Sequence, residues 1–215
     1  MTRAAIFDAV RDAARPGLFS DPGNVLALDN LLDAFGVPVD GKADTFDRCL
    51  AVILKHEGGY VDHPKDPGGA TNLGVTKATW EGYVRRAVSK ADIRALTIEK
   101  VKPLYRKNYW DAVSGDNLPA GLALCVFDFA VNAGPARANR YLQALVGSAQ
   151  DGKTGPATVS AAQAFVAAQG ERTAVQAYQA ARRGYYRSLG TFSTFGRGWL
   201  RRVDETEAEA LEMVQ

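Results

Sequence analysis

Residues 56–76 read HEGGYVDHPKDPGGATNLGVT and carry the most informative pattern in the chain. Before them, the apolar run from Phe46 to Leu54 predicts a strongly buried helix, and the paired glycines after Glu57 end it. The many Gly, Pro, Asp, Asn and Thr residues of 60–76 predict a loop and a short hairpin. We therefore expect a buried helix to open directly into a polar loop at Glu57.

Outward from this loop, the pattern becomes helical as far as the C-terminus. Helical periodicity covers residues 77–88, 97–110, 118–133, 135–146, 154–168, 171–188 and 198–214. Only about two short strands are expected beside these helices. The predicted class is mainly α (α+β), with a small β-hairpin or loop element next to the first helix of the main domain.

Residues 1–44 read as a separate helical prefix. A first helical pattern stops at Pro16-Gly17, and a second runs from Asn24 to Phe35. Proline and glycine punctuate both ends, as they do at helix boundaries. The pattern leaves open whether this prefix packs on the main domain, binds the substrate or a partner, or guards a site.

Composition limits the function classes. The chain has 215 residues and a net charge of +2, which suits one domain with an appendage and is too weakly basic to indicate nucleic-acid binding. No uncharged apolar run reaches the length that spans a bilayer, so no stable membrane insertion is expected. The first residues lack the hydrophobic core of a secretory signal, so we expect synthesis in the cytoplasm.

Cysteine and histidine spacing indicates no metal site. Cys49 and Cys125 lie in apolar runs and are predicted to be buried free thiols, with a disulfide between them as the alternative. His56 and His63 flank Glu57, but two glycines separate them, and the spacing is not that of helical zinc ligands. We expect neither a metal nor a cofactor.

Arginines gather late in the sequence, and the pattern favours a solvated helix face over a polymer-binding stripe. They are Arg182, Arg183, Arg187, Arg197, Arg201 and Arg202.

The chemistry centres on Glu57. An acid in the last turn of an apolar helix faces the negative end of the helix dipole, which disfavours its charged form and suits a proton donor. The loop that follows holds the carboxylates of Asp62 and Asp66 and the hydroxyls of Thr71 and Thr76. Glycoside hydrolysis needs such a set: an acid for the leaving oxygen, and a second polar group for the cationic centre or the attacking water. The alternative is a surface loop with incidental acids.

Several motifs in order resemble glycoside hydrolase family 108 over about residues 45–205. The matching segments are Glu57-Gly58-Gly59-Tyr60, Asp66-Pro67-Gly68-Gly69, Thr71, Gly74-Val75-Thr76, Tyr105 to Asp111, and Phe127 to Gly134. Residues 151–158 and 195–203 look like the family's peptidoglycan-binding C-terminal part.

This resemblance implies a lysozyme-like fold, with a catalytic part over 45–134 and a peptidoglycan-binding part over 135–215 packed as one globular unit. It implies hydrolysis of the β-1,4 bond between N-acetylmuramic acid and N-acetylglucosamine, with Glu57 as general acid. Asp66 and Thr71 resemble the remaining members of a phage-type Glu-Asp-Thr set. It also implies an endolysin that acts in the periplasm or cell wall after delivery by a holin or a phage particle.

Four further residues are candidates for substrate binding. Tyr60 adjoins Glu57, Asn72 follows Thr71, and Asp128 lies one turn before Asn132 on the same helix face. The structural alternatives are a core ring for Tyr60, a helix cap for Asn132 and an anchor for a backbone group in the case of Asp128.

Two rival functions stay open. A lytic transglycosylase would cleave the same bond to a 1,6-anhydro product, without a need for Asp66. A catalytically weak wall-binding or scaffold module would keep the fold without turnover.

Overall fold

The computed structural model describes residues 3–35, 37, 42–62 and 69–214. These contain eleven α-helices and one two-stranded antiparallel sheet, which confirms the predicted mainly α class with a small β element. The chain forms two compact units, 1–47 and 48–215, and the division falls inside helix α3 (Lys42–Glu57).

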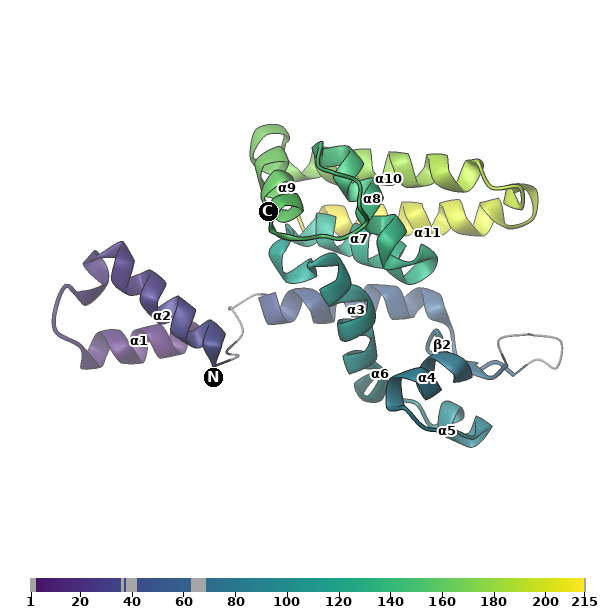
Figure 1. Ribbon diagram of the computed structural model, residues 1–215, viewed down its shortest axis with the longest axis horizontal. Coiled ribbons are helices and arrows are strands. Elements are labelled where there is room, and N and C mark those ends of the chain that lie inside the picture. The colour runs from purple at the N-terminus through teal and green to yellow at the C-terminus, as the bar shows by residue number, and fades with distance from the viewer. Residues whose placement is uncertain (1–2, 36, 38–41, 63–68, 215) are drawn as a thin grey trace. The chain divides into compact units, whose positions relative to one another are not determined.

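The first unit is a helix pair. Helices α1 (Arg3–Ala13) and α2 (Pro22–Ala34) are linked through a 3-10 turn at Leu18–Ser20 (Figure 1). The guanidinium of buried Arg3 donates to the Val37 carbonyl at 2.9 Å and to the Asp29 carboxylate at 3.0 Å. Both predicted helices of the prefix are therefore present, and one buried cation ties them together.

Helix α7 (Ala120–Ala133) is the centre of the second unit. Every residue from Gly121 to Ala130 is buried, and all but Asp128 are apolar or glycine, as expected for an enclosed helix. The helices packed against it are α8 (Pro135–Val146), α10 (Glu171–Arg187) and α11 (Phe192–Glu212), and α9 (Pro156–Gln169) packs on α8 and α10 (Figure 1). Gly121 lets α11 approach closely, because a Cβ there would lie 2.5 Å from the Ala210 carbonyl.

The sheet is a minimal hairpin. Strand β1 (Thr71–Asn72) pairs with β2 (Val75–Thr76), with Thr71 opposite Thr76. Leu73 and Gly74 form its two-residue turn, and both have positive φ, 49° and 71°. Two successive left-handed residues are what a tight hairpin turn requires.

The hairpin continues into short helices. These are α4 (Lys77–Val84), α5 (Lys90–Arg94) and α6 (Ile98–Tyr105). The Thr76 hydroxyl accepts from the Thr79 amide and so caps α4 at its first turn. The hairpin, α4 and α5 gather at one end of the second unit (Figure 1).

Several helix boundaries differ from the predictions. Helix α4 ends at Val84 and not at 88, and helix α5 lies outside the helical stretches that we predicted. The predicted helix over 97–110 changes after Tyr105 to a π-helical turn, Arg106–Trp110. Helix α11 begins at Phe192 and not at 198, and its Gly196 is packed under the Phe192 ring, where a Cβ would lie 2.5 Å from the ring. Gly196 and Gly198 disfavour a helix locally, and tertiary packing overrides that preference.

The cysteines are buried free thiols, as predicted. Burial raises the pKa of Cys49 to about 12, so its thiolate is not formed at neutral pH. Across the described part of the chain, no helix has both the length and the apolar character that a bilayer crossing needs.

Candidate active site

Glu57 is the last residue of α3, as predicted, and Gly58 with a φ of 68° ends the helix directly after it. Its side chain is 18% exposed, and Oε1 accepts a hydrogen bond from Nη2 of Arg202 at 2.7 Å. Arg202 is in α11, so a residue of the C-terminal half contacts the predicted catalytic acid. The contact is a charge-assisted hydrogen bond, which fixes the carboxylate in one orientation.

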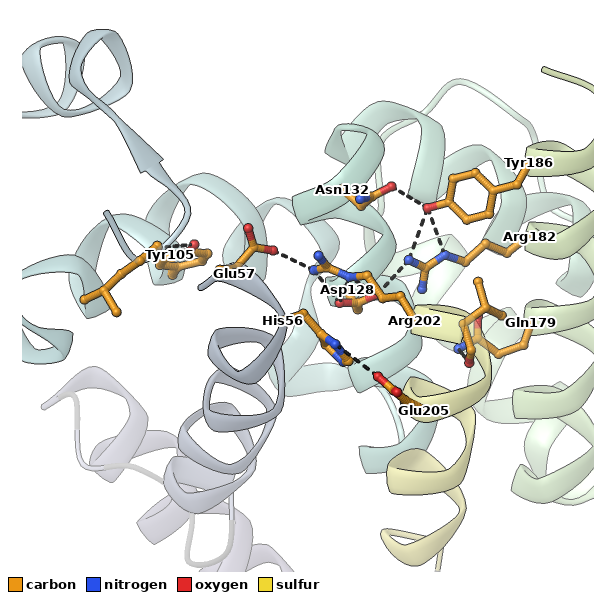
Figure 2. A network of polar contacts seen from close by, with 12 residues as sticks. His56, Glu57, Tyr105, Asp128, Asn132, Gln179, Arg182, Tyr186, Arg202 and Glu205 are labelled. Carbon is orange, nitrogen blue, oxygen red and sulfur yellow. Dashed lines mark hydrogen bonds and ion pairs between the residues drawn. The ribbon is translucent and has the colours of Figure 1, made fainter. Parts of the chain in front are cut away.

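Asp128 of α7 holds Arg202 in place from the interior of the helix bundle. Nε and Nη2 of Arg202 donate to Oδ1 of Asp128 at 3.0 and 2.8 Å, and Nη2 of Arg182 lies 2.6 Å from Oδ2 (Figure 2). The Asp128 and Arg182 side chains are both fully buried. Burial alone would raise the pKa of Asp128, but Arg182 and Arg202 outweigh it and hold that pKa at about 2. Asp128 therefore stays ionised and gives Arg202 a fixed partner.

The hairpin turn at Leu73 and Gly74 lies next to Oε2 of Glu57, the oxygen that does not accept the hydrogen bond from Arg202. A Cβ on Gly74 would lie 2.7 Å from Oε2 of Glu57 and 2.5 Å from the Tyr105 hydroxyl. That hydroxyl donates to the Leu73 carbonyl at 2.9 Å and so holds the turn in place. Gly74 is thus required twice, for its positive φ and for the space that Glu57 occupies.

Two tyrosines share the surroundings of Glu57. Burial, and then the negative charge of Glu57, raise the pKa of Tyr105 and of Tyr109, so both stay neutral. Their rings lie 5.7 Å apart. The sequence motif contained both residues, but we had assigned neither to the site.

The loop and hairpin candidates are placed as follows. Tyr60 is half-buried, with its hydroxyl 3.4 Å from Asp62 and the Arg94 guanidinium 4.5 Å above its ring. Thr71 is half-buried in β1. Asp66 lies outside the residues that the structure describes, so its predicted role stays a prediction.

Asn72 is buried, and its Nδ2 donates to the carbonyls of Ile93, Arg94 and Leu96 at 3.0–3.3 Å. This gives the amide a structural role, because it ties the hairpin to the end of α5.

The two candidates on α7 belong to one polar network. Asn132 is exposed, and its Oδ1 accepts a hydrogen bond from the Tyr186 hydroxyl, which also accepts from Arg182 (Figure 2). Asp128 is fully buried, so its contact with Glu57 runs through Arg202. Trp110 is fully buried in the core, against Phe127.

The expectation of a solvated arginine face was wrong for Arg182 and Arg202. Arg182 is fully buried and the Arg202 side chain is 14% exposed, because Asp128 neutralises both inside the helix bundle. Arg187, Arg197 and Arg201 are exposed, as expected. Asp128 was the available signal: it is the one charged residue in the sequence of α7, and a buried carboxylate needs a cationic partner.

Among the residues that the structure describes, no group of three His, Cys, Asp or Glu side chains is placed to hold a metal ion. The described side chains at the site are those of Glu57, Arg202, Tyr105 and Tyr109.

A helix-terminal glutamate between a hairpin turn and a buried ion pair, in a mainly α fold, agrees with the lysozyme-like glycosidase that the sequence resemblance predicts. The comparisons with known proteins agree. Residues 50–134 match the family model of glycosyl hydrolase 108, and residues 137–204 match a predicted peptidoglycan domain. The structure of SagA from Brucella abortus is 46% identical, covers 80% of this chain and 96% of that one, and superposes with a TM-score of 0.70. None of the curated proteins matches.

The chain belongs to the glycosyl hydrolase 108 family and is a glycoside hydrolase that acts on peptidoglycan.

Proposed function

We propose that the protein is a muramidase, which hydrolyses the β-1,4 bond between N-acetylmuramic acid and N-acetylglucosamine with Glu57 as the general acid. The observation that carries this proposal is the environment of Glu57. Its carboxylate stands at the end of α3 between the Arg202 guanidinium and the hairpin turn at Gly74. Such a fixed carboxyl group is what proton donation to a positioned leaving oxygen requires.

The two oxygens of Glu57 have different surroundings, which suggests a division of roles. Arg202 donates to Oε1, so Oε2 is the oxygen that would carry the proton. Transfer of that proton to the glycosidic oxygen breaks the C1–O bond and leaves an oxocarbenium-like sugar. Water then adds to C1 and returns a proton to the carboxylates of the site, which completes hydrolysis.

For the second polar group, we propose Asp66, which would stabilise the cationic sugar or orient the water. Thr71 would hold that water or anchor the loop, and its place in β1 is adjacent to the turn that contacts Glu57. Tyr60 and Asn132 are the candidates for contact with the sugar.

The test is Glu57→Gln, which keeps the shape of the side chain and removes its proton. We expect release of soluble fragments from purified peptidoglycan to fall by about 100-fold or more, as for loss of a general acid. Activity within a few-fold of the wild type would contradict the proposal.

Mass spectrometry of the fragments decides the reaction. Fragments with a reducible N-acetylmuramic acid end support a muramidase. Anhydro ends would identify a transglycosylase and remove the need for Asp66. Binding to peptidoglycan without any fragments would identify a wall-binding module.

We also propose that the protein serves as an endolysin, made in the cytoplasm and released to the wall by a holin or carried by a phage particle. Expression in a bacterial host with and without a holin tests this role. Lysis that needs the holin supports it, and equal lysis in both cultures argues for another export route.

A further inference from the structure

A polar pocket lies next to the end of α3, where residues of the two family-matched parts, 50–134 and 137–204, meet. Its volume is about 370 Å³, and the residues that line it are Lys55 and His56 of α3, Asn132 at the end of α7, and Gly198, Trp199, Arg201 and Glu205 of α11. Arg202 also lines it. The pocket and the candidate acid therefore share one guanidinium, because Arg202 lines the pocket and also donates to Glu57.

Gly198 leaves the backbone of α11 bare on the wall of this pocket. It stands inside a 21-residue helix, where glycine costs about 1 kcal/mol relative to alanine. Gly196 in the same helix has a packing reason, but a Cβ on Gly198 would meet no atom within 4 Å. A bare helix surface that no neighbour fills, on the wall of a pocket, allows a ligand to approach the backbone.

The charged residues in the pocket wall suit an anion, because three of them are cationic (Lys55, Arg201 and Arg202) and one, Glu205, is a carboxylate. Arg201 is 76% exposed and pairs with Glu205 only at 3.9 Å, and Nδ1 of His56 is 3.4 Å from the same glutamate. Arg201 thus keeps most of its hydrogen-bonding capacity, since its fork holds five donors. Asn132 accepts from Tyr186 through Oδ1, which turns its Nδ2 into an oriented donor.

An aromatic wall completes the pocket. The Trp199 ring stacks on Tyr186, with centroids 5.3 Å apart and planes at 26°. Tyr186 is itself held by Asn132 and Arg182, so the Trp199 ring rests on a fixed base. Such a wall packs against the apolar part of a small ligand while Arg201 and Asn132 bind its charged end.

We propose that this pocket binds a carboxylate of the short acidic peptide that peptidoglycan carries on the muramic acid next to the scissile bond. This inference rests on the proposed function, because it places that peptide beside Glu57. The cationic Arg201 and the donor Asn132 favour a carboxylate over an uncharged sugar ring. The peptidoglycan-binding half would then recognise the peptide, while the catalytic half cleaves the glycan.

The first test is a binding measurement that needs no turnover. The full chain carrying Glu57→Gln is titrated, by NMR or calorimetry, with an N-acetylmuramyl tripeptide that has free carboxylates, and with the same compound amidated. We expect the free acid to bind about ten-fold more tightly, and Arg201→Gln to remove that preference. Equal binding of both compounds, or an unchanged preference in Arg201→Gln, would overturn the inference; equal binding would instead indicate a sugar subsite.

Gly198→Ala is a second test variant, in which stability and affinity should change in opposite directions. Alanine should stabilise α11 and place a methyl group on the pocket wall, so the melting temperature should rise while affinity for the muramyl peptide falls several-fold. The matched control is Gly184→Ala in α10, whose added Cβ also meets no atom within 4 Å. It should raise stability by a similar amount and keep the affinity. A Gly198→Ala variant that binds like Gly184→Ala would count against the pocket.

Rates of peptidoglycan hydrolysis test this inference separately from the proposed function. On peptidoglycan with its peptides intact and on the same glycan after the peptides are removed, Arg201→Gln should lose more rate on the first substrate. If the wild type releases no fragments from either substrate, the muramidase proposal fails, while the binding result still decides the pocket.

Discussion

The guanidinium of Arg202 bridges Glu57 and Asp128, with hydrogen bonds of 2.7 and 2.8 Å from the same Nη2 atom. It thereby joins the end of α3 to the middle of α7, although it lies 145 residues from Glu57 in sequence. Asp128 is buried and ionised, so the position of Arg202, and through it that of Glu57, is set by the interior of the helix bundle. Arg202 is thus a positioning residue for the candidate acid.

Arg202→Gln should reduce kcat by about 10- to 100-fold, because Glu57 loses its fixed orientation. Arg202→Lys should be intermediate, since an ammonium keeps the charge but lacks the planar fork that spans two carboxylates. Fragment release at several substrate concentrations separates kcat from KM. Arg187→Gln, at the exposed end of α10, is the matched control. A change confined to KM would argue that Arg202 binds substrate and does not position Glu57.

Gly74→Ala should impair both stability and activity. The residue has a φ of 71°, and the added Cβ would collide with Glu57 and Tyr105. We expect a loss of about 1–3 kcal/mol in the free energy of unfolding, together with displacement of Glu57. Gly69→Ala has a φ of 67° with open space around its Cβ, so it reproduces the backbone strain without the collision. Equal activity in the two variants would show that the collision is harmless.

Asp128→Asn should change how stability depends on pH. The pKa of Asp128 is about 2 in the folded protein and ordinarily 3.8, so this group stabilises the fold above pH 4 and loses that effect as pH falls toward 2. The contribution is about 2 kcal/mol. Urea unfolding between pH 2 and 7 should therefore show a shallower acid decline in the variant.

At neutral pH the same variant should lose about 3–5 kcal/mol, because Arg182 is left buried without its anion. Asp204→Asn removes a carboxylate that is 63% exposed and pairs with Arg183, and should cost less than about 1 kcal/mol. Similar losses in the two variants would mean that the buried pair contributes little.

Removal of residues 135–215 should abolish cooperative folding of the rest. Helix α7 would lose α8, α10 and α11, which bury it, and Asp128 would lose both arginines. Far-ultraviolet circular dichroism during urea titration should show a broad, non-cooperative change. A sharp transition in the truncated chain would instead show that the catalytic part folds alone.

Local patterns in the sequence were enough to predict several features of this protein. Helical periodicity predicted most of the helices, and the turn residues around Gly74 predicted the hairpin. The paired glycines placed Glu57 at the end of its helix. These features depend on side-chain spacing and backbone preference over a few residues, which is the range that a local pattern covers.

Only the tertiary structure decided which residues surround Glu57. Arg202 and Arg182 have the sequence signature of a solvated helix face, and the pairing with Asp128 arises when α10 and α11 pack on α7. The need for Gly74 to leave room for Glu57 also depends on contact between separate elements. Ion pairs between residues far apart in the chain form only when the hydrophobic faces of their helices are buried together, so a local pattern determines the helix while packing determines the site.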